Sequence, residues 1–199
     1  MFLHLNLTTL LQTIGYFGLF AFVFAESGLF FGFFLPGDSL IFTAGLLAAT
    51  GYFSIVLIIV IVFLGAVLGD SFGYFFGKRT GKYIFKKDDS FIFSKKNLEK
   101  SQAFYKNHGS KTIILARFIP IVRTFAPILA GTSNMSYKKF LAFNIIGGIG
   151  WTLLLTLLGY ILGNSVPHID HYLLMVIFII IVISFLPVLW ELYREGFKK

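Results

Sequence analysis

The chain has 199 residues, of which 57% are hydrophobic and only 13% are charged, and its formal net charge is +8. A soluble domain carries about a quarter charged residues, so this composition excludes an ordinary soluble globular protein and predicts an integral membrane protein. The absence of cysteine excludes disulfides, thiolate metal sites and a cysteine nucleophile.

The first apolar stretch covers residues 7–25 and contains a few polar residues and glycines, among them Gln12 and Gly15. This composition is compatible with a full span or with a helix that lies along the membrane interface. No Lys or Arg precedes the stretch, which argues against a cleaved signal peptide.

Residues 26–50 contain turn chemistry within an otherwise apolar segment. Pro36 fixes φ, Gly37 accepts positive φ, and Asp38 can cap a helix that begins there. We therefore expect two helical arms joined by a turn in this segment.

Three later runs have the length and composition of membrane helices: 53–77, 140–163 and 172–190. A helix of about 20 apolar residues crosses the hydrocarbon core. The first run carries a single charge, Asp70, and the other two carry none. The alternative, a set of buried core helices in a soluble protein, fits three such runs poorly.

Basic residues are concentrated in the centre of the chain. Residues 78–139 contain fourteen Lys and Arg against three acids, whereas residues 1–77 contain no Lys or Arg and three acids. A basic patch can bind nucleic acid, but short Lys- and Arg-rich loops of membrane proteins stay in the cytoplasm, and we prefer this interpretation. It predicts that residues 78–111 and the C-terminus are cytoplasmic, that 53–77 and 140–163 run in opposite directions, and that nucleic acid is not a partner.

Residues 112–135 form a second broken segment, in which Pro120 and Pro127 flank Arg123. With 78–111 inside, both broken segments begin and end on one side of the membrane. This pattern predicts two re-entrant hairpins, 26–50 and 112–135, whose broken backbone is surrounded by protein or by a water-filled cavity. Two ordinary spans with a proline kink are the alternative, which would place a basic segment outside.

The two halves of the chain, 7–77 and 112–163, resemble each other. Gly45 is followed 28 residues later by Gly73 in a Gly-Tyr-x-x-Gly sequence, and Gly131 is followed 28 residues later by Gly159 in the same pattern. Because the helices are predicted to run in opposite directions, this is an inverted repeat, as in many secondary transporters. The expected fold is a single all-α polytopic membrane domain, residues 1–199, with two opposed re-entrant hairpins and about three to four full spans.

Charged side chains at membrane depth are costly, so those in the broken segments indicate either a site or a structural pairing. Glu26 and Asp38 lie in the first segment, and Arg117 and Arg123 lie in the second. In the structural interpretation the acids only hold the hairpins together. In the functional one, the planar fork of arginine binds phosphate and a desolvated carboxylate carries a proton. Both interpretations are valid together if the acids pair with the arginines until an anionic headgroup displaces the acids.

Four short motifs occur in order within roughly residues 20–165. They are Glu26-Ser27-Gly28, Leu35-Pro36-Gly37-Asp38-Ser39-Leu40, Gly69-Asp70-Ser71-Phe72-Gly73-Tyr74-Phe75-Phe76-Gly77-Lys78 and Ala116-Arg117-Phe118-Ile119-Pro120-Ile121-Val122-Arg123-Thr124. Together they resemble the DedA family, also described as SNARE-associated or VTT-domain proteins.

This resemblance implies a multi-pass protein of the bacterial inner membrane with two opposed re-entrant hairpins. It also implies movement of lipids between leaflets, including undecaprenyl phosphate and phosphatidylethanolamine, in dependence on the proton motive force. The functional acids of the family match Glu26 and Asp38, and its functional arginines match Arg117 and Arg123.

The resulting hypothesis is a lipid translocase without a cofactor or metal site. Arg117 and Arg123 would bind the phosphate of a membrane phospholipid or polyprenyl phosphate, while Glu26 and Asp38 would gate or couple transport through protons. Supporting roles are assigned to Asp70, Pro36, Gly37 and Pro120.

Two other classes stay open: a proton-coupled ion or small-solute transporter, and a non-transporting scaffold in which the charges are only structural. An enzyme is not expected, because the sequence has no nucleophile elbow and no phosphate-binding loop after a strand. His168-x-x-His171 resembles a metal pair but fits a solvated outer loop better.

Overall fold

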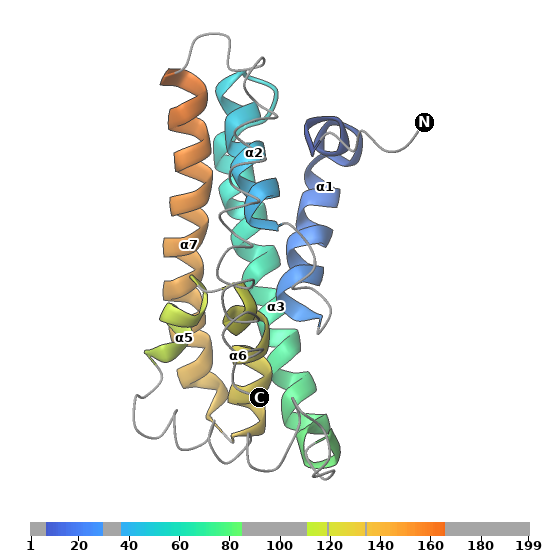
Figure 1. The fold of residues 1–199 in the computed structure, drawn as a ribbon. Helices are drawn as coiled ribbons and strands as arrows, with labels where there is room; N and C mark the ends of the chain where they lie inside the picture. The colour runs from blue at the N-terminus through green and yellow to red at the C-terminus, as the bar shows by residue number, and fades with distance from the viewer. Residues whose placement is uncertain (1–6, 30–36, 85–110, 119, 134, 166–199) are drawn as a thin grey trace, which may run out of the picture. The chain divides into compact units, whose positions relative to one another are not determined.

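The computed structural model describes residues 7–29, 37–84, 111–118, 120–133 and 135–165, and these residues form helices and short connections without a strand (Figure 1). The helices are α1 (Leu7–Gly28), α2 (Gly37–Ala49), α3 (Ile55–Ile84), α5 (Thr112–Ala116), α6 (Pro120–Thr132) and α7 (Tyr137–Ser165). The all-helical prediction is confirmed for the described part of the chain.

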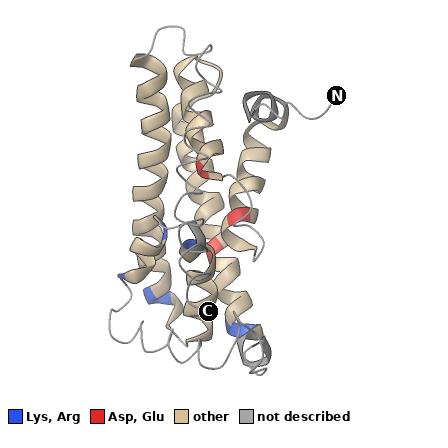
Figure 2. Cartoon of the chain, viewed as in Figure 1, with Lys and Arg blue, Asp and Glu red and all other residues tan. Residues whose placement is uncertain are grey.

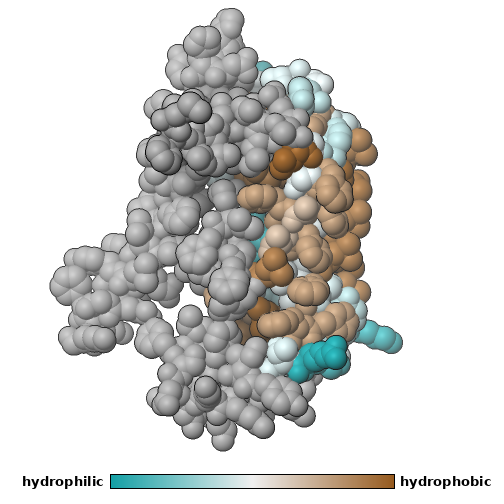
Figure 3. Space-filling model, turned by 90° about the vertical axis from the view of Figure 1, so that its right-hand side faces the viewer, coloured by the Kyte–Doolittle hydropathy of each residue, from teal (hydrophilic) through white to brown (hydrophobic). Residues whose placement is uncertain are grey.

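Two of these helices have the length and apolar composition of membrane spans, α3 over Ile55–Thr80 and α7 over its whole length. They contain most of the predicted runs 53–77 and 140–163, although α3 continues to Ile84 and α7 begins at Tyr137. Large apolar side chains are exposed along both, including Leu64 and Leu68 on α3 and Ile149 and Ile161 on α7. In the described part of the face shown in Figure 3, apolar side chains predominate, as expected for a surface in contact with lipid. The run 172–190 lies outside the described residues.

Helix α1 is bent at Gly15, whose φ of 59° and ψ of −155° belong to a region that glycine adopts and other residues avoid. The helix continues past the predicted boundary at residue 25 and includes Glu26 in its last turn. No helix-breaking residue lies between Gly18 and Gly28, which explains why Glu26 belongs to the last turn of this helix instead of beginning a separate arm.

The described residues divide into two compact units. The first unit contains residues 7–19, 37–61 and 153–165, and the second contains residues 20–29, 62–84, 111–118, 120–133 and 135–152. Each unit is therefore assembled from segments that lie far apart in the sequence.

Within the first unit, α2 packs against the last part of α7 through glycines. A side chain at Gly45 would overlap the carbonyl group of Thr156, and one at Gly159 would overlap the carbonyl group of Phe42. Such close approach of helix backbones is common in membrane proteins, where small residues line the interfaces.

Within the second unit, α6 packs against the last part of α3 in a corresponding way. A side chain at Gly131 would overlap the carbonyl group of Tyr74, and one at Gly77 would overlap that of Ile128. The glycines of the sequence repeat, Gly45 in one half and Gly131 in the other, thus each allow close contact with a long helix, α7 in the first unit and α3 in the second.

The end of α3 and the start of α7 lie together in the second unit, where the rings of Phe75 and Tyr137 have centroids 4.8 Å apart. This contact places the exposed Lys78 at the same end of the unit as the exposed Lys138 and Lys139. Figure 2 shows basic residues near these ends of α3 and α7. The predicted orientation requires these basic groups to share one side of the membrane, and their assignment to the cytoplasm stays a prediction.

Helices α5 and α6 pack against each other and are connected by residues 117–119. The segment 112–135 is therefore a pair of short helices, as the sequence predicts, and its re-entrant nature stays a prediction. Of the first broken segment, the structure describes α2, which begins at Gly37, whereas the turn with Pro36 lies outside the described residues.

Candidate functional site

The second unit contains two buried ion pairs. Arg117 pairs with Asp70 of α3, and Arg123 of α6 pairs with Glu26 of α1. The exposed fraction of each of these four residues is between 4% and 7%. Since isolated buried charges are strongly destabilising, the pairing explains how an apolar protein retains them.

Close helix contact brings the two acids into the same unit. A side chain at Gly28 of α1 would lie 2.8 Å from the carbonyl oxygen of Gly69, and one at Gly69 of α3 would lie 2.7 Å from that of Phe24. Only glycines allow α1 and α3 to approach in this way. Glu26 precedes Gly28 by two residues and Asp70 directly follows Gly69, so both acids lie near the point of contact.

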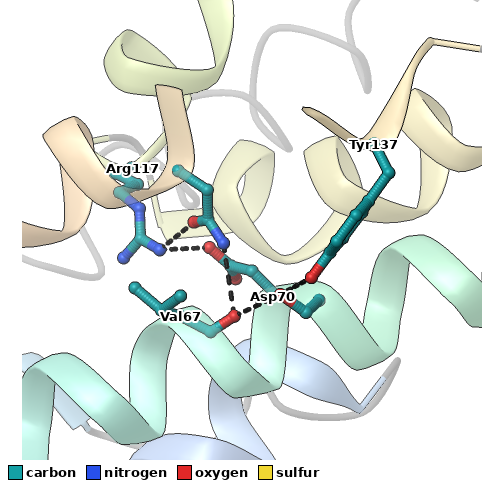
Figure 4. A network of polar contacts seen from close by, with 6 residues as sticks. Val67, Asp70, Arg117 and Tyr137 are labelled. Carbon is teal, nitrogen blue, oxygen red and sulfur yellow. Dashed lines mark hydrogen bonds and ion pairs between the residues drawn. The ribbon is translucent and has the colours of Figure 1, made fainter. Parts of the chain in front are cut away.

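Arg117 follows α5 directly and enters a network of polar groups between α3 and α7 (Figure 4). Its Nη2 donates hydrogen bonds to Asp70 and to the side-chain oxygen of Asn144. The side-chain nitrogen of Asn144 donates to the carbonyl oxygen of Val67 at 3.2 Å. The Nε atom of Arg117 is buried and has no acceptor among the described residues, so one donor of the guanidinium is left unsatisfied within the described part of the chain.

Ser71 extends this network along α3. Its hydroxyl donates to the carbonyl oxygen of Val67 at 2.7 Å and accepts a hydrogen bond from the hydroxyl of Tyr137 at 3.2 Å. The carbonyl of Val67 thus accepts from both Ser71 and Asn144, and the hydrogen bonds of Asn144 and Tyr137 join α7 to α3 around Asp70.

Arg123 has an aromatic partner in addition to Glu26. Its guanidinium carbon lies 4.6 Å from the ring centroid of Trp151, which is 3% exposed. This is a cation–π geometry, and it places the arginine of α6 against the face of an α7 tryptophan.

The other residues predicted for the site lie elsewhere or only bound its helices. Asp38 is half-buried in the first turn of α2 and belongs to the first unit. Gly37 begins α2 and Pro120 begins α6, the helix position that proline favours. Asp70, predicted to have a supporting role, is a direct partner of Arg117. All four histidines lie outside the described residues.

Three contacts of this site were missed by the sequence reasoning, those of Asn144, Gly147 and Trp151. Asn144 could have been found from the sequence, because it is the only amide side chain in the apolar run 140–163. A buried amide in a membrane helix requires a hydrogen-bond partner, and this requirement alone would have pointed to the arginines.

Chemically, the site consists of two arginines and two carboxylates held in an apolar environment. A guanidinium presents parallel N–H donors that fit the oxygens of a carboxylate and of a phosphate equally well. By chemistry alone, a phosphate is a suitable replacement for a carboxylate at either guanidinium.

Comparison with known proteins gives a match to the VTT domain over residues 35–161, a range that includes Asp70, both arginines and the α7 residues but not Glu26. The chain is 45% identical to Protein DedA of Escherichia coli K12 over 179 residues, covering 89% of this chain and 81% of that protein. It is 47% identical to the uncharacterized membrane protein Rv0364 of Mycobacterium tuberculosis H37Rv over 174 residues, which cover 86% of this chain and 76% of that protein. It is 34% identical to the inner membrane protein YqjA of E. coli K12 over 150 residues, which cover 75% of this chain and 68% of that protein. No solved structure matches.

Proposed function

Because this chain belongs to the VTT-domain family, to which DedA also belongs, and is a membrane protein, we propose that it moves a phosphate-bearing lipid between the leaflets of the bacterial inner membrane. Undecaprenyl phosphate and phosphatidylethanolamine are the substrates we would test first. The relatives' names support a membrane location and the family, and the proposal of lipid transport rests on the chemistry of the site.

The observation that carries the proposal is the state of Arg117. This residue is 5% exposed, and its Nε–H has no acceptor among the described residues, although its Nη2 donates to Asp70 and Asn144. An unused buried donor is costly, and a bound phosphate oxygen would satisfy it. Arginine suits this role because it stays protonated at every relevant pH and binds phosphate with two parallel donors.

In the proposed cycle the carboxylates occupy the arginines while no lipid is bound. A phosphate that enters the site replaces Asp70 at Arg117 or Glu26 at Arg123, and the released carboxylate takes up a proton. Protonation removes the charge that would otherwise be left buried without a partner, which links lipid binding to protons. A role in proton coupling is also proposed for Asp38, in the first turn of α2.

The test is reconstitution in vesicles of phosphatidylethanolamine and phosphatidylglycerol that contain a trace of fluorescent phosphatidylethanolamine. Leaflet exchange is followed by chemical quenching of the outer leaflet. We expect exchange above that of empty vesicles, a loss of at least tenfold in Arg117→Ala, and a partial loss in Arg117→Lys, because ammonium lacks the fork. Arg79→Ala is the matched control, since Arg79 is exposed near the end of α3.

Absence of exchange by the wild-type protein for this probe and for a polyprenyl phosphate would refute the proposal, as would full activity of Arg117→Ala. Uptake of small solutes or sodium–proton exchange in lipid-tight vesicles would instead favour the ion or solute transporter.

The scaffold hypothesis is separated by exchanging the charges of one ion pair. The double variant Glu26→Arg with Arg123→Glu keeps both charges of the pair observed in the second unit. A scaffold should regain normal stability and cellular function with this exchange, whereas a phosphate site should regain stability but not transport.

A further inference from the structure

One face of α7 contacts both arginines of the site. Asn144 accepts a hydrogen bond from Arg117, Gly147 lies against the side chain of Arg117, and Trp151 lies against Arg123. Residues separated by three, four and seven positions share one face of an α-helix. We call these three residues the α7 arginine face.

Asn144 has a fixed orientation in this face. It is fully buried, its side-chain oxygen accepts from Arg117, and its side-chain nitrogen donates to the carbonyl of Val67 at 3.2 Å. An amide group accepts through oxygen and donates through nitrogen, so turning it over would place a donor against Arg117 and an acceptor against the carbonyl of Val67, and both hydrogen bonds would be lost. The acceptor that faces Arg117 is therefore held in place by the backbone of α3.

Gly147 provides the space in which the stem of Arg117 lies. A methyl group at Gly147 would lie 3.0 Å from the Cδ of Arg117 and 3.5 Å from its Nε. The first distance is shorter than a normal contact between carbon atoms, which is about 3.5–4.0 Å. The methyl group would also lie 3.2 Å from the Cα of Ile114, so either α5 or the stem of Arg117 has to shift by a few tenths of an ångström, and the flexible arginine stem yields more readily than the backbone.

Trp151 holds Arg123 without using a charge. The attraction between a guanidinium and an indole ring arises from the quadrupole of the ring, and a buried, desolvated pair is stronger than an exposed one. It does not depend on whether Glu26 is ionised or has moved away.

We propose that the α7 arginine face is a positioning surface that keeps both guanidinium groups in place while their carboxylate partners are exchanged for a lipid phosphate. This inference rests on the proposed function and identifies which contacts persist during the cycle. All three residues are uncharged, so they hold the arginines without competing with an anion. Contacts that are equally strong before and after the exchange do not oppose it, and they reduce the entropy lost on binding because the donors are already oriented.

The test compares phosphate binding in matched variants of the full-length protein. The probe is dodecyl phosphate, a single-chain phosphate monoester, added to protein in a neutral detergent, and its affinity is obtained from the rise in Tm of each variant relative to its own baseline. The fluorescent-lipid exchange assay gives the second readout.

Gly147→Ala and Gly150→Ala form the first matched pair. Both replace glycine with alanine in the same helix, but a methyl group at Gly150 meets no atom within 4 Å. We expect Gly147→Ala to weaken dodecyl phosphate binding by about tenfold, and Gly150→Ala to bind like the wild type, because only the former displaces Arg117.

Trp151→Leu and Trp151→Phe form the second pair. Leucine removes the aromatic face and is expected to weaken binding by roughly tenfold, whereas phenylalanine keeps a smaller face and should restore part of the loss. Asn144→Ala is expected to weaken binding by about tenfold, because a hydrogen bond to a charged group is lost.

Three results would overturn the inference: wild-type affinity in Gly147→Ala, Asn144→Ala and Trp151→Leu; equal losses in Gly147→Ala and Gly150→Ala; or no rescue by Trp151→Phe. The last two would show that these positions matter only for general stability. If the wild type neither binds dodecyl phosphate nor moves lipid, the proposed function itself fails, which is a different outcome.

Discussion

Replacing Arg117 with methionine is expected to be strongly destabilising, because it leaves Asp70 buried without its cation. Both residues are 5% exposed, and removal of one partner from a buried ion pair costs about 3–5 kcal/mol of unfolding free energy. Asp70→Leu should cost a similar amount, since it leaves the guanidinium charge with Asn144, a neutral partner.

The double variant, Arg117→Met with Asp70→Leu, is expected to be more stable than either single variant. Both charges are then absent, and replacement of a whole buried pair by apolar residues is often nearly neutral. What remains is the side-chain oxygen of Asn144, which loses its donor at Arg117, and an unsatisfied buried acceptor costs about 1–3 kcal/mol. We therefore expect the double variant to lie about 1–3 kcal/mol below the wild type.

The measurement is equilibrium unfolding of the purified protein in detergent, with Arg79→Met as a control for the loss of an exposed arginine. Lipid exchange should be absent in the double variant despite its recovered stability, because the proposed phosphate ligand is missing. If the two single losses simply add in the double variant, to roughly 6–10 kcal/mol, the residues do not interact as described and the reasoning fails.

Three further predictions concern unfolding in detergent. Gly131→Ala should destabilise the protein by about 2 kcal/mol more than Gly150→Ala, because its methyl group overlaps the carbonyl of Tyr74 and overpacking has a cost of this order. Equal stability of the two variants would argue against this contact. Gly15→Ala should cost about 1–3 kcal/mol, because alanine rarely adopts the backbone angles observed there, and an unchanged Tm would indicate that the bend is not required. Tyr74→Phe should cost about 1 kcal/mol, since its hydroxyl donates to the carbonyl of Met135, and a neutral result would show that water replaces this bond.

Helices α3 and α7 were predictable because long apolar runs leave few alternatives to a span. The ends of these helices were harder to predict. Helix α3 continues beyond Gly77 into a basic segment, where no apolar pattern indicates a helix. The end of α1 was placed too early, since the charge of Glu26 was interpreted as a boundary although a charged residue does not end a helix.

The four charged residues of the site were found because charge in an apolar segment is costly, but their pairing was not contained in the sequence. The expectation that acids of the first hairpin face the arginines holds for Glu26, whereas Arg117 pairs with Asp70, which lies on the following helix. Asn144 and Trp151 were missed because a neutral amide or an aromatic residue in a membrane helix has many explanations, and its partner depends on tertiary packing.

The separation of the ion-pair partners along the chain has a consequence for biosynthesis. Glu26 precedes Arg123 by 97 residues, and Asp70 precedes Arg117 by 47 residues. At a rate of about 5–20 residues per second, each acid is synthesised seconds before its arginine, by about 2–9 s for Asp70 and about 5–19 s for Glu26. During that interval α1 and α3 must enter the membrane, or wait beside it, with a carboxylate that its arginine does not yet neutralise. The insertion machinery therefore has to accept a protonated or temporarily shielded acid, and the arginines of the second half complete a fold that the first half cannot complete alone.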